Sequence, residues 1–301
     1  MGMDVPADLA ADTRARKLAP GRYQLDLSPA WNFLLPSGGV LATAALRAAL
    51  DELDDPALRL VSATTTFCTP VQAGPLAIDV TILRRGASAS QVRIAARTVG
   101  AAEPGLETLA TFARDRVGPE LIGARAPAVP PPDQCVDHGD SRAPFFANLD
   151  ARRAAGSALR GPDVVAGPAY HARWFRYRVP QRDRGLLDRL ALPPLADTMP
   201  VALAQAIGPS PYRFFAPSLD LTVQVIDDTA REWVLVASRV RRAHTGWAIG
   251  EAELWDDDGR LLAIASQAMY VRTVAGEAPT VDASGRADFP LAAPAAGRDP
   301  T

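Results

Sequence analysis

Apolar and polar residues alternate along several segments in the last third of the chain. Such alternation places successive side chains on opposite faces of an extended backbone. The pattern predicts four consecutive strands, at Ser218–Val225, Trp233–Val240, Trp247–Trp255 and Leu261–Arg272. Asp257-Asp258-Gly259 predicts a hairpin turn between the last two. Two polar residues do not fit the pattern, Asp220 among apolar neighbours and Gln267 in the middle of the last strand, and both are candidates for function.

The first third of the chain has a related order of elements. A helix is predicted over Val40–Leu53, where apolar residues recur at helical spacing, with Ser37 as its N-cap. The Gly38-Gly39 pair leads into this helix, which is rich in alanine and can therefore lie close to a sheet. Strands are predicted on both sides of it, at Arg22–Ser28 before it and at Leu58–Cys68, Leu76–Arg84, Ser88–Thr98 and Glu107–Arg114 after it.

A strand, a helix and then four antiparallel strands is the order of elements in a hotdog domain, where a curled sheet wraps a long helix. The same order recurs as a strand at Tyr170–Val179, a short helical piece at Leu186–Leu192, a helix at Leu195–Ile207 that contains Pro200, and the four strands of the last third. We therefore expect an α+β double hotdog fold. Its expected parts are hotdog domains at 1–118 and 166–275, an irregular connector rich in Pro and Gly at 119–165, and a disordered tail at 276–301.

Composition narrows the classes of function. The chain has 301 residues and a net charge of −2, which argues against nucleic acid or an anionic membrane as its partner. It contains no run of 18 apolar residues and begins without the pattern of a secretory signal, so we expect a cytoplasmic protein with no membrane span. Cys68 and Cys135 are then expected to be reduced thiols. Three scattered histidines predict no metal site, and no cofactor is expected.

Three segments carry a resemblance to a known family: the PSGG entry to the first helix, LRRGASASQVRIAAR, and GEAELWDDDGRLLAIASQAMYVR. They resemble the double-hotdog acyl-CoA thioesterases of the acyl-CoA thioesterase II (TesB-like) type, over about Tyr23 to Arg272. In that family an Asp on the strand after the second helix, a Gln on the last strand and a Thr or Ser between them orient the water that attacks the thioester. The resemblance implies that the chain hydrolyses an acyl-CoA, a small-molecule substrate, to a free acid and CoA.

Carried over by motif, the family Asp falls on Asp220 and the family Gln on Gln267. The hydroxyl residue has no clean match, because Arg239-Val240-Arg241 stands at its place, and Ser238 is the preferred candidate over Thr245. Aligning the halves puts Ser62 opposite Asp220, so the first half is expected to be non-catalytic.

The chemistry explains these residue types. Asp220 can act as general base towards water, with partial burial raising its pKa, while Gln267 holds the same water. Backbone N–H groups at a helix N-terminus would stabilise the oxyanion. Substrate-binding roles are expected for Gly38, Gly39 and Met199. The acyl chain is expected to lie between a helix and the sheet, along Leu195, Met199 and Leu203.

Several alternatives stay open from the sequence. A non-catalytic acyl-CoA-binding protein would explain the missing hydroxyl residue, and a hotdog dehydratase or hydratase would need an Asp/His pair. His244 beside Arg241 and Arg242 fits either a CoA phosphate site or an exposed turn. The aromatic and basic residues of Tyr170–Val179 fit either a nucleotide site or a strand with a buried face. Pairing between sheet edges would give a homo-oligomer.

Overall fold

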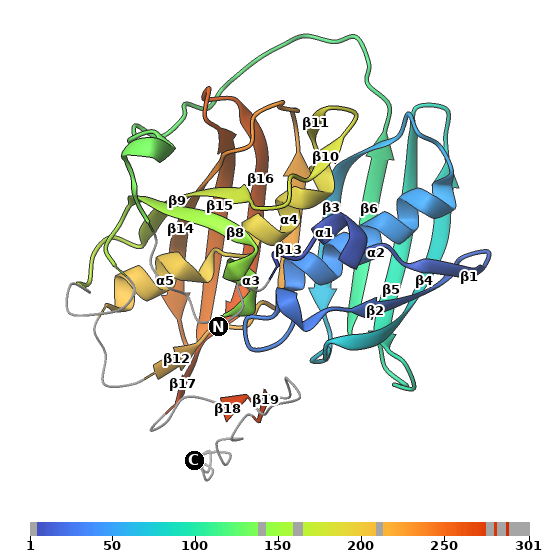
Figure 1. The fold of residues 1–301 in the computed structure, drawn as a ribbon, viewed down its shortest axis with the longest axis horizontal. Coiled ribbons are helices and arrows are strands. Elements are labelled where there is room, and N and C mark those ends of the chain that lie inside the picture. The colour runs from blue at the N-terminus through green and yellow to red at the C-terminus, as the bar shows by residue number, and fades with distance from the viewer. Residues whose placement is uncertain are drawn as a thin grey trace, which may run out of the picture.

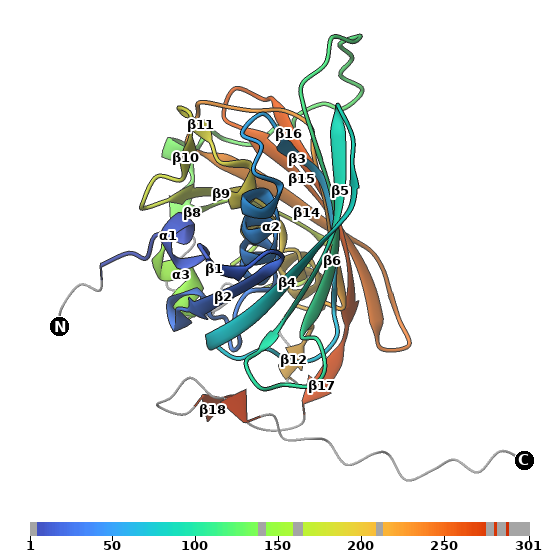
Figure 2. The same ribbon diagram turned by 90° about the vertical axis from the view of Figure 1, so that its right-hand side faces the viewer.

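One large antiparallel sheet organises the protein (Figure 1). The computed structural model describes residues 5–137, 143–158, 165–208, 213–274, 280–281 and 287–288. Thirteen strands follow one another in the order β1-β2-β4-β5-β6-β3-β13-β16-β15-β14-β9-β8-β7. The sheet curls around the helices, which Figure 2 shows on its inner side.

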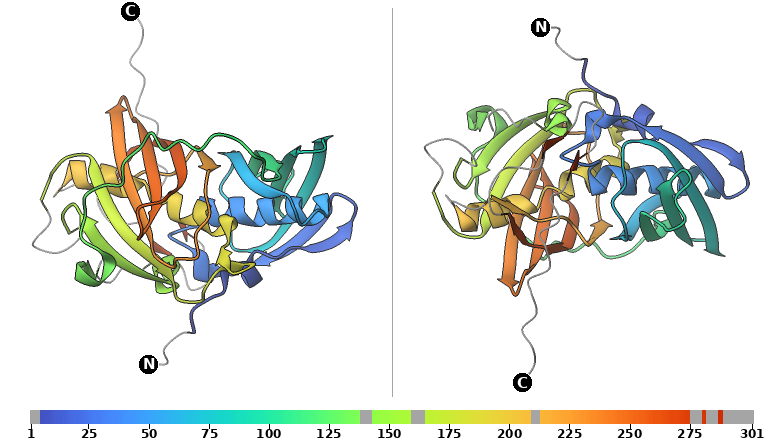
Figure 3. Two further views of the ribbon diagram at one scale, coloured as in Figure 1. Left: turned by 90° about the horizontal axis from the view of Figure 1, so that it is seen from above. Right: turned by 90° about the horizontal axis from the view of Figure 1, so that it is seen from below.

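The two halves of the chain contribute the two halves of this sheet (Figure 3). The first half supplies β1 (Arg16–Ala19), β2 (Arg22–Leu27), β3 (Arg59–Phe67), β4 (Gly74–Arg85), β5 (Ala89–Thr98) and β6 (Leu106–Ala113). The second half supplies β7 (Val136–Asp137), β8 (Leu149–Ala155), β9 (Tyr170–Tyr177), β13 (Asp220–Val225), β14 (Val234–His244), β15 (Trp247–Asp256) and β16 (Leu261–Tyr270). They join where β3 pairs with β13.

The remaining elements are short or lie against the sheet. The helices are α1 (Leu9–Asp12), η1 (Pro29–Trp31), α2 (Gly38–Leu53), η2 (Pro132–Gln134), α3 (Pro144–Ala147), η3 (Arg189–Ala191), α4 (Leu192–Ala196) and α5 (Pro200–Ile207). The small strand pairs are β10 (Arg182–Asp183) with β11 (Leu186–Leu187), β12 (Arg213–Phe215) with β17 (Arg272–Val274), and β18 (Thr280–Val281) with β19 (Ala287–Asp288).

The double hotdog prediction is confirmed. The predicted first helix is α2, and the strands predicted around it are β2 to β6, with small differences at their ends. In β13 the residues Leu221, Val223 and Val225 are buried as the alternation indicated, and Gly259 takes a positive φ in the predicted hairpin turn.

The predicted connector is wrong in part, because β8 lies inside it and pairs with β9 along the main sheet. Its proline-rich part also packs. The Trp174 indole Nε1 donates to the Pro130 carbonyl over 2.9 Å, and Cys135 and Val129 contact the outer face of the second half. The predicted tail, 276–301, lies largely outside the described residues.

The predicted second helix is broken into two pieces. Pro200 has no N–H to donate to the preceding turn, so α4 ends at Ala196 and α5 begins at Pro200. The helical piece predicted at Leu186–Leu192 is β11 followed by η3. Among the described residues one helical run, Arg189–Ile207, is long and apolar enough to span a membrane by composition, but 78% of that window is buried inside the fold.

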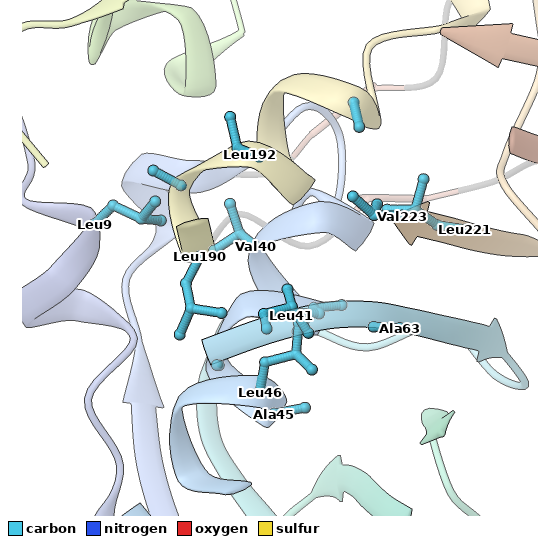
Figure 4. Close-up of a cluster of buried hydrophobic side chains, with 14 of the residues drawn as sticks. Leu9, Val40, Leu41, Ala45, Leu46, Ala63, Leu190, Leu192, Leu221 and Val223 are labelled. Carbon is cyan, nitrogen blue, oxygen red and sulfur yellow. The ribbon is translucent and has the colours of Figure 1, made fainter. Parts of the chain in front are cut away.

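The two halves share one hydrophobic core. Val40, Leu41 and Leu46 of α2 pack in the same cluster as Leu190 and Leu192 of the second half, as Figure 4 shows. Hydrogen bonds cross the same contact, where the Thr43 hydroxyl donates to the Leu190 carbonyl over 2.8 Å. The side chains of Arg47 and Asp188 form an ion pair at 2.8 Å. The antiparallel approach of α2 to η3 and α4 therefore sets how the halves fit together.

Gly39 permits this approach. A Cβ added there would lie 2.3 Å from the Pro193 carbonyl oxygen, a backbone atom with no freedom to withdraw. We expect Gly39→Ala to lower the free energy of unfolding by about 1–3 kcal/mol, as overpacking does in other tightly packed sites. Urea denaturation measures the effect.

Gly118→Ala is the matched control, because a Cβ there meets nothing within 4 Å. Equal stability of the two variants would show that the contact between α2 and α4 is looser than the geometry indicates.

Candidate active site

The interruption between α4 and α5 places a carboxylate inside the core. Asp197 follows α4 directly, and its backbone N–H donates to the Pro193 carbonyl over 3.0 Å. Its side chain points towards the start of α2 rather than to solvent, and the residue is 6% exposed. A continuous helix would have left this residue on a helix face, so the break is what positions it.

Four donors converge on the Asp197 carboxylate, two from each half of the chain. One oxygen, Oδ2, accepts from the Ser37 hydroxyl and from the Gly39 backbone N–H, both over 3.0 Å. The other, Oδ1, accepts from the Ser218 hydroxyl over 3.1 Å and from the Gln267 amide Nε2 over 2.9 Å. Ser37 was predicted as a helix cap, but it makes no capping bond within α2, because its hydroxyl serves Asp197.

Burial raises the pKa of Asp197 above its ordinary value, and the hydrogen bonds from Gly39, Ser37, Ser218 and Gln267 work against that rise by favouring the ionised form. Burial and the four donors therefore act in opposite directions on the ionisation of this carboxyl group.

Gln267 links the carboxylate to a second polar group. Its Nε2 also hydrogen-bonds the Ser218 hydroxyl, so Asp197, Ser218 and Gln267 form a closed polar cluster. The remaining atom of the amide, Oε1, is buried without a hydrogen-bond partner among the described residues. Ser218 is only partly buried, so the cluster reaches the surface on its side.

The structure separates Asp220 from Gln267, so the predicted pairing of the two around one water is wrong. Asp220 pairs with Thr66 on the outer face of the sheet, and its Oδ1 accepts from the Ala268 backbone N–H over 2.8 Å. Gln267, one residue from Ala268, points to the inner face and is 1% exposed. Adjacent strand residues point to opposite faces, and this parity overrides the match of flanking motifs.

Ser238 is also displaced from the cluster. It faces inwards from β14 in register with Ala252, while Gln267 is in register with Gly250, so β15 lies between the two side chains. Its hydroxyl is buried and has no hydrogen-bond partner within the described part of the chain. Thr245, the other hydroxyl considered, is exposed at the β14–β15 turn. The hydroxyl that meets Gln267 is that of Ser218.

The residues predicted to bind substrate lie around this cluster. Gly39 donates its N–H to Asp197, and Gly38 lies under the Phe67 ring, where a Cβ would come within 2.5 Å of that ring. Met199 lies over Gly250, the register partner of Gln267. Leu195, Met199 and Leu203 are all buried beside the inner face of the sheet.

A buried cation stands next to the break. The Arg173 guanidinium donates to the Thr198 carbonyl over 3.2 Å, and burial lowers its pKa to about 9. Burial and the neighbouring Arg173 charge lower the pKa of His171 to about 3, which keeps that imidazole neutral. The aromatic and basic strand at 170–179 thus turns His171, Arg173 and Phe175 into the core, and this favours the reading of a strand with a buried face.

Asp197 and Ser218 were missed at the level of sequence, although one signal was present. Asp197 is the only charged residue between Arg189 and Arg213. A lone carboxylate in such an apolar run must be buried with partners or exposed at a break. In the part of the chain that the structure describes, no three His, Cys, Asp or Glu side chains gather into a group that could hold a metal ion.

Comparison with known protein families shows which family the chain belongs to. The acyl-CoA thioesterase N-terminal domain matches residues 27–113, and the acyl-CoA thioesterase C-terminal domain matches residues 125–271. The chain belongs to the acyl-CoA thioesterase family. Asp197, Ser218 and Gln267 all lie within the C-terminal family domain, and Ser37 and Gly39 lie within the N-terminal one.

Solved structures agree with this family fold. A candidate thioesterase II from Thermobifida fusca YX is 25% identical, with a TM-score of 0.74, and the match covers 90% of this chain and 100% of that one. The acyl-CoA thioesterase II TesB2 from Mycobacterium marinum is 23% identical, with a TM-score of 0.71 and the same coverage. A hot dog fold protein of unknown function from Alicyclobacillus acidocaldarius is 22% identical, with a TM-score of 0.77, covering 89% of this chain and 99% of that one. No curated protein matches the chain.

The raised pKa of Asp197 predicts a pH dependence of stability. Between the unfolded pKa and the higher folded pKa, the folded state binds more protons than the unfolded state, so stability falls as pH rises through this window. As pH rises above the ordinary Asp pKa of 3.8, we expect the parent to lose stability relative to Asp197→Asn. The free energy of unfolding of the variant minus that of the parent should therefore increase with pH.

Urea denaturation of parent and variant at several pH values measures this difference. The Asn amide can donate to Ser218 and to a turned Gln267, so the variant is expected to fold. A difference that stays constant with pH would mean that Asp197 titrates alike in both states.

Proposed function

We propose that this member of the family hydrolyses acyl-CoA thioesters to a free acid and CoA. The observation that carries the proposal is the convergence of Ser218, Gln267, Ser37 and Gly39 on the buried Asp197 carboxylate. Asp197 takes the role that the sequence had assigned to Asp220, and Ser218 takes that of Ser238. Gln267 keeps its predicted role.

In the proposed reaction, water binds between Gln267 Oε1, the Ser218 hydroxyl and Asp197. Asp197 accepts a proton from this water as its oxygen attacks the thioester carbonyl. The tetrahedral intermediate then expels the CoA thiolate, which takes up a proton. The start of α2 faces the site through the Gly39 N–H, which donates to Asp197, and the positive end of the helix dipole there favours negative charge.

Two alternative functions, a non-catalytic acyl-CoA-binding protein and a dehydratase, are less well supported by the contacts of Asp197. The missing hydroxyl residue favoured a non-catalytic binding protein, but Ser218 supplies one. A dehydratase needs an Asp/His pair, and among the described residues no histidine hydrogen-bonds Asp197. Placement of the acyl chain along Leu195, Met199 and Leu203 remains part of this proposal, as do the cytoplasmic location and a homo-oligomeric state.

Exchanging the two carboxylates tests the proposal most directly. We expect Asp197→Asn to lower kcat/KM for acyl-CoA by roughly 10²- to 10⁴-fold, the usual contribution of a general base. Asp220→Asn should leave it unchanged, because Asp220 lies on the outer face of the sheet. Release of free thiol from a panel of acyl-CoA esters of varied length measures both and gives the preferred acyl length. The reverse result would return the base to Asp220.

The two serines form a second matched pair. Ser218→Ala removes a hydrogen bond to a carboxylate and should lower kcat by roughly 10- to 100-fold. Ser238→Ala removes a buried hydroxyl that makes no bond to the cluster and should keep full activity. The same thiol assay measures both, and a loss confined to Ser238→Ala would contradict the proposed role of Ser218.

A further inference from the structure

Arg173 connects the break between α4 and α5 to the rest of the fold. It lies on β9 and is 2% exposed, so its guanidinium group is inside the protein. That group donates to the carbonyl of Thr198, the residue that follows Asp197, over 3.2 Å. The same carbonyl accepts from the Val201 N–H over 3.3 Å at the start of α5. Arg173 therefore holds the backbone immediately beside the proposed general base.

The same guanidinium contacts two aromatic rings. Its central carbon lies 4.8 Å from the ring centre of Phe175 and 5.7 Å from that of Phe146. The two rings are stacked, with their centres 6.4 Å apart. A cation is attracted to the face of an aromatic ring, and the attraction is strongest where water is excluded. The planar guanidinium of Arg173 can stack on a ring and donate a hydrogen bond at the same time, which the compact ammonium group of lysine cannot match.

The rings connect Arg173 to the loop that carries Ser37. Phe146 belongs to α3, and its ring centre lies 5.6 Å from that of Phe33, which is in the loop between η1 and α2. This loop ends at Ser37, whose N–H donates to the Trp31 carbonyl over 3.1 Å and whose hydroxyl is part of the polar cluster. Contacts therefore run from Arg173 to both sides of the site, the helix break of the second half and the loop of the first half.

A neutral donor would satisfy the Thr198 carbonyl at less cost than a buried charge, which must be removed from water. The guanidinium does more than a neutral donor, because it contacts the helix break and the aromatic rings together. We propose that Arg173 is a positioning residue for the hydrolysis reaction. It links the break to the rings, and so holds Asp197 within hydrogen-bonding distance of the Ser37 hydroxyl. This inference rests on the proposed function, since it takes Asp197 as the general base.

Substitutions of Arg173 should change kcat rather than KM. We expect Arg173→Met to lower kcat for acyl-CoA by roughly 10²-fold, the cost of displacing a catalytic group by about 1 Å. KM should change little, because no group that binds the substrate is removed. Arg173→Lys keeps the charge and a donor but loses the planar stack, so it should recover part of kcat. Release of free thiol at several substrate concentrations measures both constants.

Arg176→Met is the matched control. Arg176 lies on the same strand, and its guanidinium also stacks on an aromatic ring, 4.9 Å from the ring centre of Trp233. Strand alternation turns it to the outer face of the sheet, where it pairs with Asp150, so its loss should leave kcat unchanged. Unchanged kcat in Arg173→Met, or an equal loss in the two Met variants, would overturn the proposal.

Phe146→Leu keeps the test decisive if Arg173→Met does not fold. This variant retains the buried charge but removes one of the two rings that the guanidinium contacts. It should lower kcat in the same direction as Arg173→Lys, with KM unchanged. Full kcat in both Phe146→Leu and Arg173→Lys would show that the link between the rings and the helix break does not position Asp197.

The pH dependence of stability tests the link without any catalysis. The Ser37 hydrogen bond favours the ionised form of Asp197, so its loss in Arg173→Lys would raise the pKa of Asp197 further. The stability gained by Asp197→Asn as pH rises should therefore be larger in the Arg173→Lys background than in the parent, by urea denaturation. Arg173→Lys keeps a positive charge beside His171, so the low pKa of that imidazole is maintained.

An identical gain in the two backgrounds would overturn the positioning role, because Arg173 would then support the fold without acting on Asp197. Failure of the proposed function gives a different result. A parent that releases no free thiol from any acyl-CoA would contradict hydrolysis, while a larger gain in the Arg173→Lys background would still support the link between Arg173 and Asp197.

Discussion

The buried carboxylate of Asp197 is the constraint on which the rest of the structure depends. Removing a charge from water is costly unless hydrogen bonds replace the lost solvation, and four donors do so here. Two of them, Ser37 and Gly39, come from the first half of the chain, and Ser218 and Gln267 come from the second. The carboxylate can therefore receive all four hydrogen bonds only when the two halves of the chain are packed as observed.

Several irregularities of the fold follow from this requirement. The second helix breaks at Pro200, so that Asp197 can turn out of a helical surface and into the space at the start of α2. Gly39 lacks a side chain, so that Pro193 can approach and its own N–H can reach the carboxylate. Ser37 gives up its capping bond within α2 for the same reason. Each of these features contributes to one polar cluster.

The two similar halves of the chain contribute different groups to the polar cluster. Both halves build a helix against a curled sheet, and one hydrophobic core runs through both. The carboxylate and the amide lie in the second half, while the first half provides the helix N-terminus that they face. The first half, which Ser62 led us to expect to be non-catalytic, supplies two of the four hydrogen bonds to Asp197.

The sequence by itself determined the fold: the period of two in the strands, the alanine-rich helix after Gly39 and the repeated order of elements predicted the double hotdog. It also determined Gln267, because a polar residue in a buried strand position is visible in the alternation. Only the tertiary structure decided which carboxylate and which hydroxyl that amide meets. Asp220 was preferred because it matches the family motif, and Ser238 because it is the hydroxyl nearest to the motif's third position. A strand turns alternate residues to opposite faces, however, and register decides which side chains meet. Asp197 lies at a helix break and Ser218 directly before a strand, where the spacing of apolar residues predicts no side-chain direction. The cluster around Asp197 also depends on contacts between residues far apart in the chain, such as Ser37 and Asp197, which are 160 positions apart.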